Sequence, residues 1–189
     1  MANSIQDFKT TLKKGGARPN LFEVILTDVP GGQGGFNSRD FSILCKAAQL
    51  PASNIASIDV PFRGRIFKVA GDRTFDTWTV TVINDEDFAI RKAMEGWMQF
   101  IGQYGDASGS TSPQDYMKEA TVRQLTRNAS TTGNTPFGGG LSVAAQYKFF
   151  DIFPTNVSAI DLSYDTSDTI EEFTVEFQVQ YWTPYSGQS

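Results

Sequence analysis

Histidine is absent from the 189-residue chain, and cysteine occurs once, as Cys45. Without histidine, a Ser–His–Asp or Cys–His catalytic relay cannot form, and neither can a histidine-ligated zinc or iron site. A single cysteine excludes an intrachain disulfide, which is compatible with a reducing compartment. General acid–base chemistry near neutral pH would therefore depend on carboxylates, lysines or tyrosines with shifted pKa values.

Long apolar runs are also missing. No segment approaches the roughly 20 apolar residues of a membrane-spanning helix, and the first residues lack the apolar run of a secretion signal. We therefore expect no membrane insertion by the chain itself. Sixteen Lys and Arg residues face 21 Asp and Glu residues, a net charge of −5. This balance argues against a protein that wraps nucleic acid, because phosphate binding needs a basic surface.

Short strands with alternating apolar and polar residues dominate the pattern. The alternation is clearest over residues 74–83 and 172–182. Residues 21–27 and 40–47 are expected to pair as a hairpin with an exposed glycine-rich tip. Further strands are expected over residues 55–60, 65–69, 119–126, 144–153 and 157–163, with a turn at Gly71-Asp72 and a strand end at Pro154.

One helix is expected over residues 84–104, capped by Asn84 or Asp85 and ended by Gly102 and Gly105. Apolar residues recur there at helical spacing, with Tyr104 as the last of them. The residues expected to form the helix core stripe are Ile90, Met94, Trp97, Met98 and Ile101.

These elements predict a mainly β domain with one flanking α-helix, an α+β arrangement resembling a β-sandwich or barrel. We expect a single domain over residues 1–189. Flexible loops are expected at about 30–38, 105–115 and 128–140, where glycine and small polar residues concentrate, and a C-terminal tail over 183–189.

No segment predicts catalysis. The glycine-rich stretches are not followed by a Lys-Ser/Thr pair, so they do not indicate a phosphate-binding loop. The acidic run from Asp85 to Asp87 fits the start of a helix better than a metal site. Glu171, Glu172 and Glu176 have no visible catalytic partner. We therefore expect no catalytic residues, no metal and no cofactor, and an interaction or assembly protein fits better than an enzyme.

The local concentration of basic residues has two interpretations. It can contact phosphate, or it can pair with acidic neighbours within the chain or across a subunit boundary, and the acidic composition favours the second. In an extended segment Arg63 and Arg65 would share one face. The candidate residues are Arg63, Arg65, Lys68 and Arg73.

Several segments, in order and over nearly the whole chain, resemble the tail tube proteins of contractile-tailed, T4-like bacteriophages. The block from Val69 to Asp85, with AGDRTF, WTVTV and ND, is the most specific of them. The other segments that carry the resemblance are ARPNLF at 17–22, CKA at 45–47, LP at 50–51, VRQ at 122–124, FPTNV at 153–157 and the stretch 173–182.

The resemblance implies a virion structural protein of the phage tail, assembled in the host cytoplasm. Hexameric rings, in which each subunit gives strands to a continuous inner β-barrel, would stack helically inside a contractile sheath. The implied partners are other copies of the chain, the tail sheath protein, and baseplate and tail-terminator proteins. The tape measure protein and DNA would occupy the lumen without specific binding, and an acidic lumen would repel DNA and let it slide during ejection.

Two surfaces are expected in such a tube. Segment 52–73 is the candidate contact between rings, with the four basic residues named above. The candidate lumen-facing residues belong to two strands, either of which can line the lumen: Thr77, Thr79 and Thr81 in the first, or Thr174, Glu176, Gln178 and Gln180 in the second. The alternatives are a baseplate tube initiator or terminator, the tube of a phage-like injection particle, a sugar-binding β-sandwich adhesin and a carboxylate-based hydrolase.

Overall fold

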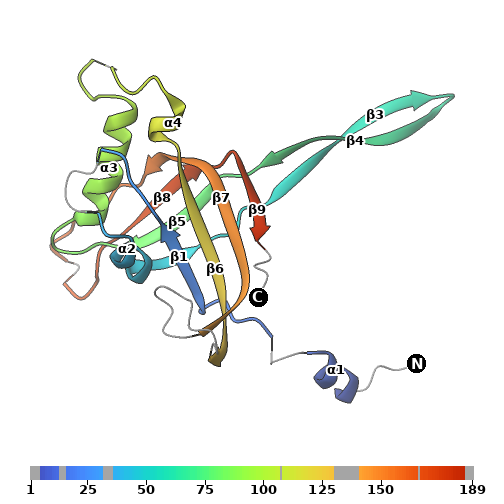
Figure 1. Ribbon diagram of the computed structural model, residues 1–189, viewed down its shortest axis with the longest axis horizontal. Helices are drawn as coiled ribbons and strands as arrows, with labels where there is room; N and C mark the ends of the chain where they lie inside the picture. Colours follow the sequence, from blue (N-terminus) through green and yellow to red (C-terminus); the bar gives the residue numbers. More distant parts are fainter. Residues whose placement is uncertain are drawn as a thin grey trace.

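The computed structural model of the chain describes residues 5–12, 16–31, 36–106, 108–129, 141–165 and 167–185. Figure 1 shows a body of crossing strands and short helices from which one long hairpin extends. In chain order the elements are α1 (Ile5–Thr11), β1 (Phe22–Leu26), α2 (Ser38–Leu44), β2 (Cys45–Ala48), β3 (Ser53–Phe62), β4 (Arg65–Phe75), β5 (Trp78–Ile83), α3 (Ala89–Ile101), α4 (Pro113–Tyr116), β6 (Lys118–Ala129), β7 (Leu141–Val157), β8 (Glu172–Gln178) and β9 (Tyr181–Tyr185).

The body is one seven-stranded sheet in the order β1-β6-β7-β8-β5-β2, with β9 paired to β7; β3 and β4 form a separate two-stranded sheet. Strand β7 pairs with β6 and β9 up to Ile152, and with β8 over Phe153–Val157. A bulge between Pro154 and Asn156 accompanies this change of partner, and bulges bend strands. The sheet is thereby divided into a β6 layer (β1, β6, β9 and the first part of β7) and a β5 layer (β2, β5, β8 and the last part of β7), which cross in Figure 1.

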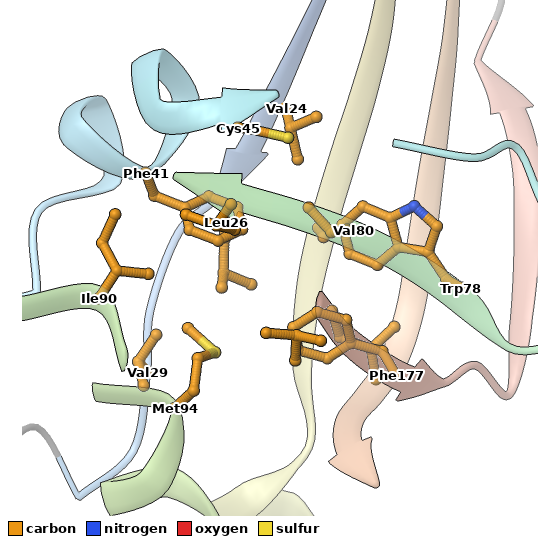
Figure 2. Close-up of a cluster of buried hydrophobic side chains, with 14 of the residues drawn as sticks. Val24, Leu26, Val29, Phe41, Cys45, Trp78, Val80, Ile90, Met94 and Phe177 are labelled. Atoms are coloured by element: carbon orange, nitrogen blue, oxygen red, sulfur yellow. The ribbon is translucent and has the colours of Figure 1, made fainter. Parts of the chain in front are cut away.

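The hydrophobic core lies between the two layers. Trp78 of β5 is fully buried, and its ring stacks on Phe149 of β7 with 4.9 Å between ring centroids. Phe177 of β8 lies 5.2 Å from the same indole. Figure 2 shows Leu26 of β1 and Phe41 of α2 reaching this region as well. Each large apolar side chain buried in this way contributes roughly 1.5–3 kcal/mol, so the body has a core within a single chain.

Helix α3 borders this core with an apolar stripe. The Trp97 indole N–H donates a hydrogen bond to the carbonyl oxygen of Tyr116 over 2.8 Å, so this buried donor has a partner. Tyr104 lies beyond the helix end and is 75% exposed, which places it outside the stripe. The stripe residues are buried or half-buried: Ile90, Met94, Trp97, Met98 and Ile101.

The helix is shorter than the expected span of 84–104. The Asp85 carboxylate accepts a hydrogen bond from the backbone N–H of Ala89 over 3.1 Å, and Phe88 precedes the helix with φ 55°. Residues 84–88 therefore lead into α3 and do not form its first turn. At the other end the Gly102 N–H donates to the Met98 carbonyl, and Gly102 has extended backbone angles. The prediction that Gly102 ends the helix is confirmed.

The prediction that residues 21–47 form one hairpin is wrong. Strand β1 pairs with β6, β2 pairs with β5, and α2 occupies much of the expected second strand. The Asn37 side chain accepts from the Arg39 N–H and caps α2, while Phe41 is fully buried. A Cβ on Gly31 would lie 2.6 Å from the Gly96 carbonyl oxygen. The chain therefore passes tightly against α3 at Gly31, although Gly31 itself is exposed, and residues 32–35 of the expected tip lie outside the described residues.

The expected turn at Gly71-Asp72 is also wrong. Gly71 lies inside β4, at a bulge where Gly71 and Asp72 are opposite Ala56 of β3, and a Cβ on Gly71 would be 3.1 Å from the Ala56 carbonyl oxygen. Glycine thus permits a close approach of two strands here and does not mark a turn. The expected strand over 74–83 is divided, because β4 ends at Phe75 and β5 begins at Trp78.

The last third of the chain departs from expectation at three places. Strand β7 continues through Pro154, since the adjacent bulge accommodates a proline. Among the described residues of 158–171 there is no strand, so the one expected over 157–163 is absent beyond Val157. The alternating stretch 172–182 is divided between β8 and β9, and residues 183–185 pair with β7 although a tail was expected there.

The fold class is confirmed in its main part: the described chain is mainly β with some helices. The expectation of one flanking helix is too low, because α1, α2 and α4 are also present, α4 within the expected loop 105–115. None of the described helices is long and apolar enough to span a membrane. Of the expected loops and tail, residues 32–35, 107, 130–140 and 186–189 lie outside the described residues.

Candidate assembly surfaces

The β3–β4 hairpin turns tightly at its tip. Phe62 pairs with Arg65, and the two residues between them, Arg63 and Gly64, have φ values of 45° and 82°. Positive φ at both central residues is typical of a type I′ turn, whose twist matches that of the two strands. No atom lies within 4 Å of the position that a Gly64 Cβ would occupy. The tip therefore stands clear of the body, as Figure 1 shows.

One face of the hairpin is a row of exposed apolar side chains, here called the hairpin ladder. The cross-strand pairs Ile58–Val69 and Val60–Phe67 place four of them side by side, and Phe62 extends the row. Their exposed fractions run from 41% for Val69 to 66% for Phe67. Contiguous apolar surface of this kind is typical of a surface that another molecule covers.

Two of the basic candidates have partners on the hairpin itself. The Arg63 guanidinium lies over the Phe62 ring, 5.4 Å from its centroid. Lys68 pairs with Asp59 across the strands, with 3.0 Å between Nζ and Oδ1. Because Arg63 occupies the turn, the expectation that it shares an extended face with Arg65 is wrong.

The other two basic candidates lie at the two ends of β4. Arg65 is opposite Phe62 at the tip, and Arg73 is opposite Ile55 near the base. Within the described ranges neither guanidinium takes part in an ion pair. The hairpin thus combines an uncovered apolar ladder with two guanidinium groups, of Arg65 and Arg73, that form no ion pair with the described residues of the same subunit.

A second surface is the face of the β5 layer that points away from the core, here called the threonine face. The cross-strand pairs Thr79–Glu176 and Thr81–Thr174 lie on it, and Gln178 continues it along β8. All five side chains are half-buried, while the residues that alternate with them are buried in the core. Most of this face carries hydroxyl and amide groups.

The remaining lumen candidates lie outside the strands of this face. Thr77 is exposed in the connection between β4 and β5, and Gln180 is exposed between β8 and β9. Glu172, which begins β8 on the same face, pairs with Lys46 of β2 with 2.5 Å between Nζ and Oε1. The structure therefore brings together five of the seven candidates.

Among the residues that the structure describes, the thiol and the carboxylates form no arrangement typical of a catalytic centre. Cys45 is 7% exposed, and burial raises the pKa of its thiol to about 12, so a nucleophilic thiolate is disfavoured at neutral pH. Glu171 accepts a hydrogen bond from the Asn84 side-chain amide over 3.0 Å. No group of three or more potential metal-ligating residues occurs in the part of the chain that the structure describes.

The hairpin ladder is the surface that sequence reasoning missed. A signal for it exists, because Ile58, Val60 and Phe62 occupy every second position immediately before the Arg63-Gly64 step. Interpreting the dipeptide Arg63-Gly64 as a two-residue turn would have predicted both the hairpin and its apolar face.

Comparison with known proteins identifies the family. A family model described as phage tail tube protein matches residues 17–185. The tail tube protein gp19 of Enterobacteria phage T4 is 36% identical over 166 residues, which cover 88% of this chain and 90% of that protein. The tail tube protein of Serratia phage KSP90 is 22% identical over 188 residues, 98% of each chain.

Solved structures share the fold at low sequence identity. A chain of the sheath–tube complex of an extracellular contractile injection system (PVC) has a TM-score of 0.60 at 13% identity, covering 94% of this chain and 96% of that one. A chain of the anti-feeding prophage tube-terminating cap has a TM-score of 0.61 at 16% identity, covering 90% and 91%. With the family model matching residues 17–185 and a relative 36% identical over most of both chains, this chain belongs to the phage tail tube protein family.

Proposed function

We propose that the chain is the structural, non-enzymatic subunit of a phage tail tube, in which hexameric rings stack helically around a channel for DNA. The observation that carries this proposal is the projecting hairpin, whose apolar ladder is uncovered in the single subunit. A two-stranded ribbon is at best marginally stable alone in water. Contact with another copy would cover the ladder and stabilise the ribbon.

Ring closure would use the two edges of the β5 layer. Strand β2 is one edge of the sheet. Residues 153–157 of β7 pair only with β8 among the described strands, so they form the other edge. Exposed strand edges are prone to pair with other chains. Pairing of β2 in one subunit with the end of β7 in its neighbour would join the layers into one continuous barrel.

In that barrel the threonine face would line the lumen, since the opposite face packs against the subunit's own core. A lining of threonine and glutamine side chains with the Glu176 carboxylate offers no cation to DNA phosphates. The charge of Lys46, on the neighbouring strand β2, is neutralised by its ion pair with Glu172. Phosphate binding depends on Lys and Arg, so DNA would pass this surface without specific binding. The net charge of −5 per subunit also disfavours binding of DNA, because it repels the phosphates.

The proposed location is the virion tail, inside a contractile sheath, after assembly in the host cytoplasm. The proposed partners are further copies of the chain, the tail sheath protein, baseplate and tail-terminator proteins, and the tape measure protein and DNA in the lumen. Family membership and the fold shared with a chain of a sheath–tube complex support this set. The fold is also shared with a tube-terminating cap, so a terminator that does not polymerise is the second candidate.

Electron microscopy of the purified chain over a concentration series tests the proposal. The protein is imaged alone and after addition of baseplates stripped of sheath. Hollow tubes of uniform bore in either condition are the expected result. A chain that stays monomeric in both conditions would contradict a tube subunit, and single rings that never stack would favour the terminator.

A further inference from the structure

We propose that the hairpin tip of one subunit docks into a hollow on a second copy of this chain, so that successive subunits join head to tail. The hollow is formed by the segment that connects β7 to β8. The inference rests on the proposed tube function and adds the acceptor surface for the hairpin. It is carried by the shape and apolar rim of the hollow, by complementary charge, and by the placement of the two surfaces in the molecule.

The hollow lies in the connection that follows β7. Residues 159–164 and 169–172 line an open hollow of about 660 Å³. Leu162 and Ile170 are 81% and 73% exposed, and Tyr164 is fully exposed. An apolar rim of this kind complements the ladder of the hairpin, where Phe62 and Phe67 are 64% and 66% exposed.

The charges of the two surfaces are opposite. Residues 60–69 at the hairpin tip contain three basic residues and no acidic one, and of the three only Lys68 is ion-paired, with Asp59. Residues 158–172 contain five acidic residues and no basic one, and of the five Glu172 is ion-paired, with Lys46. Within the described ranges neither Asp161 nor Asp168 forms an ion pair. Arg65 at the tip is also without an acidic partner there, and complementary charges of this kind steer association and set its register.

The two surfaces lie at opposite ends of the molecule. In Figure 1 the hairpin tip is at the right, and the β7–β8 connection is at the left, near the start of α3. The Asn84 N–H donates to the Glu171 carbonyl over 2.9 Å, which fixes that end of the connection beside the residues leading into α3. The tip therefore cannot reach the hollow of its own subunit.

Contact between two different surfaces on separate copies is a heterologous interface, and such interfaces build rings or open helical polymers. Ten residues of β3 in extended conformation reach about 33 Å. The hairpin can therefore enter a neighbouring subunit while the two bodies remain side by side or stacked.

Cysteine cross-linking tests the contact. The variant carries Phe62→Cys and Leu162→Cys in the same chain, and the buried Cys45 stays unreactive because burial raises the pKa of its thiol to about 12. After assembly under reducing conditions and oxidation, we expect a ladder of covalently linked oligomers. The matched control is Ile43→Cys with Leu162→Cys, because Ile43 on α2 is 64% exposed, as Phe62 is. We expect no ladder from the control.

Tubes that give no ladder with Phe62→Cys and Leu162→Cys, or an equal ladder with the control, would overturn the proposed acceptor and leave the tube function standing. Failure of the unmodified chain to form tubes would instead remove the tube function. The two failures are therefore distinguishable.

Charge exchange provides a second test that does not depend on the cysteine variants. Arg65→Glu alone and Asp161→Lys alone should each raise the protein concentration needed for tube growth by more than about tenfold. The double variant restores opposite charges and should assemble near the unmodified concentration. A folded double variant that assembles no better than the single variants would also overturn the contact.

Discussion

The β3–β4 hairpin and the β5–β8 strand pair are built from similar antiparallel, alternating strands, yet they differ in what covers their apolar faces. Val80 and Phe177 of the β5–β8 pair are fully buried beneath the β6 layer and α3. Val60 and Phe67 of the hairpin are 43% and 66% exposed. The polar residues of the two elements differ as well, since hydroxyl and amide groups dominate the threonine face and cations the hairpin tip.

Alternation of apolar and polar residues therefore indicates a strand with one apolar and one polar face. It does not specify whether the same subunit or another molecule covers the apolar face. The apolar face of the β5–β8 pair stabilises the subunit. The ladder of the hairpin adds little to the subunit, because its side chains remain in water, and its burial is available for assembly. The predictions below separate these two roles.

The largest expected effect is on the free energy of unfolding of the single subunit. Phe177→Ala removes a ring at the centre of the core and should cost about 3–5 kcal/mol, as should Trp97→Ala. Phe67→Ala, the matched change on the ladder, should stay within about 0.5 kcal/mol. Denaturant unfolding of the unassembled subunit measures both. Similar losses for Phe177→Ala and Phe67→Ala would show that the ladder is covered within the subunit.

The buried thiol of Cys45 gives the core a pH dependence. Burial raises its pKa from 9.0 to about 12, so between these values the folded state keeps a proton that the unfolded state has lost. Stability from this group is therefore complete below pH 9 and should fall above it by about 1.4 kcal/mol per pH unit. The measurement is the unfolding free energy against pH for the unmodified chain and Cys45→Ala. Identical slopes would place the thiol in water.

The threonine face should affect DNA passage and leave subunit stability unchanged. Glu176→Lys with Gln178→Lys introduces cations on the proposed lumen surface, and these would bind passing phosphates and slow DNA ejection while tubes still form. Ejection is followed by dye-binding fluorescence in virions that carry the variant tube. Gln99→Lys with Gln103→Lys, two exposed positions at and just beyond the end of α3, is a control that adds charge outside the lumen and outside the hairpin. Unchanged ejection in the double variant would place this face elsewhere in the tube.

The smallest expected effect concerns the Lys68–Asp59 ion pair on the hairpin. Both side chains are more than a third exposed, at 67% and 50%, so solvent screens the pair and limits its contribution to about 0–1 kcal/mol. Lys68→Ala should leave the unfolding free energy of the free subunit almost unchanged, in both low and high salt. A large, salt-dependent loss would indicate that the hairpin is a stabilising part of the single subunit.

The sequence predicts the local patterns and fails where distant segments decide the structure. The strict alternation around Val175 and the apolar stripe around Trp97 each follow from neighbouring residues, because their periods match a strand and a helix. The end of the helix at Gly102 follows in the same way, whereas the expected cap at Asn84 or Asp85 is wrong, because Phe88 is the residue that precedes the helix. Family membership was also evident from the block around Gly71.

Tertiary contacts explain the main errors. A strand was expected over residues 40–47, but a cap at Asn37 and burial of Phe41 hold residues 38–44 as α2. Gly71 looks like a turn residue in isolation, whereas it permits a close backbone contact with Ala56 of the paired strand, and Gly31, which does lie in a turn, also packs tightly against Gly96 of α3. The acceptor hollow has no local signal, because its exposed apolar residues, such as Leu162, are recognisable only once the body has folded.

Hydrogen exchange of the backbone amides in free subunits and in assembled tubes tests the central claim most directly. The account predicts that amides of β3 and β4 exchange rapidly in the free subunit and become protected in the tube. Amides of β5 and β8 should be protected in both states, since their core is complete within one chain. Equal protection of the hairpin amides in free subunits and tubes would contradict the claim that a second copy completes the hairpin.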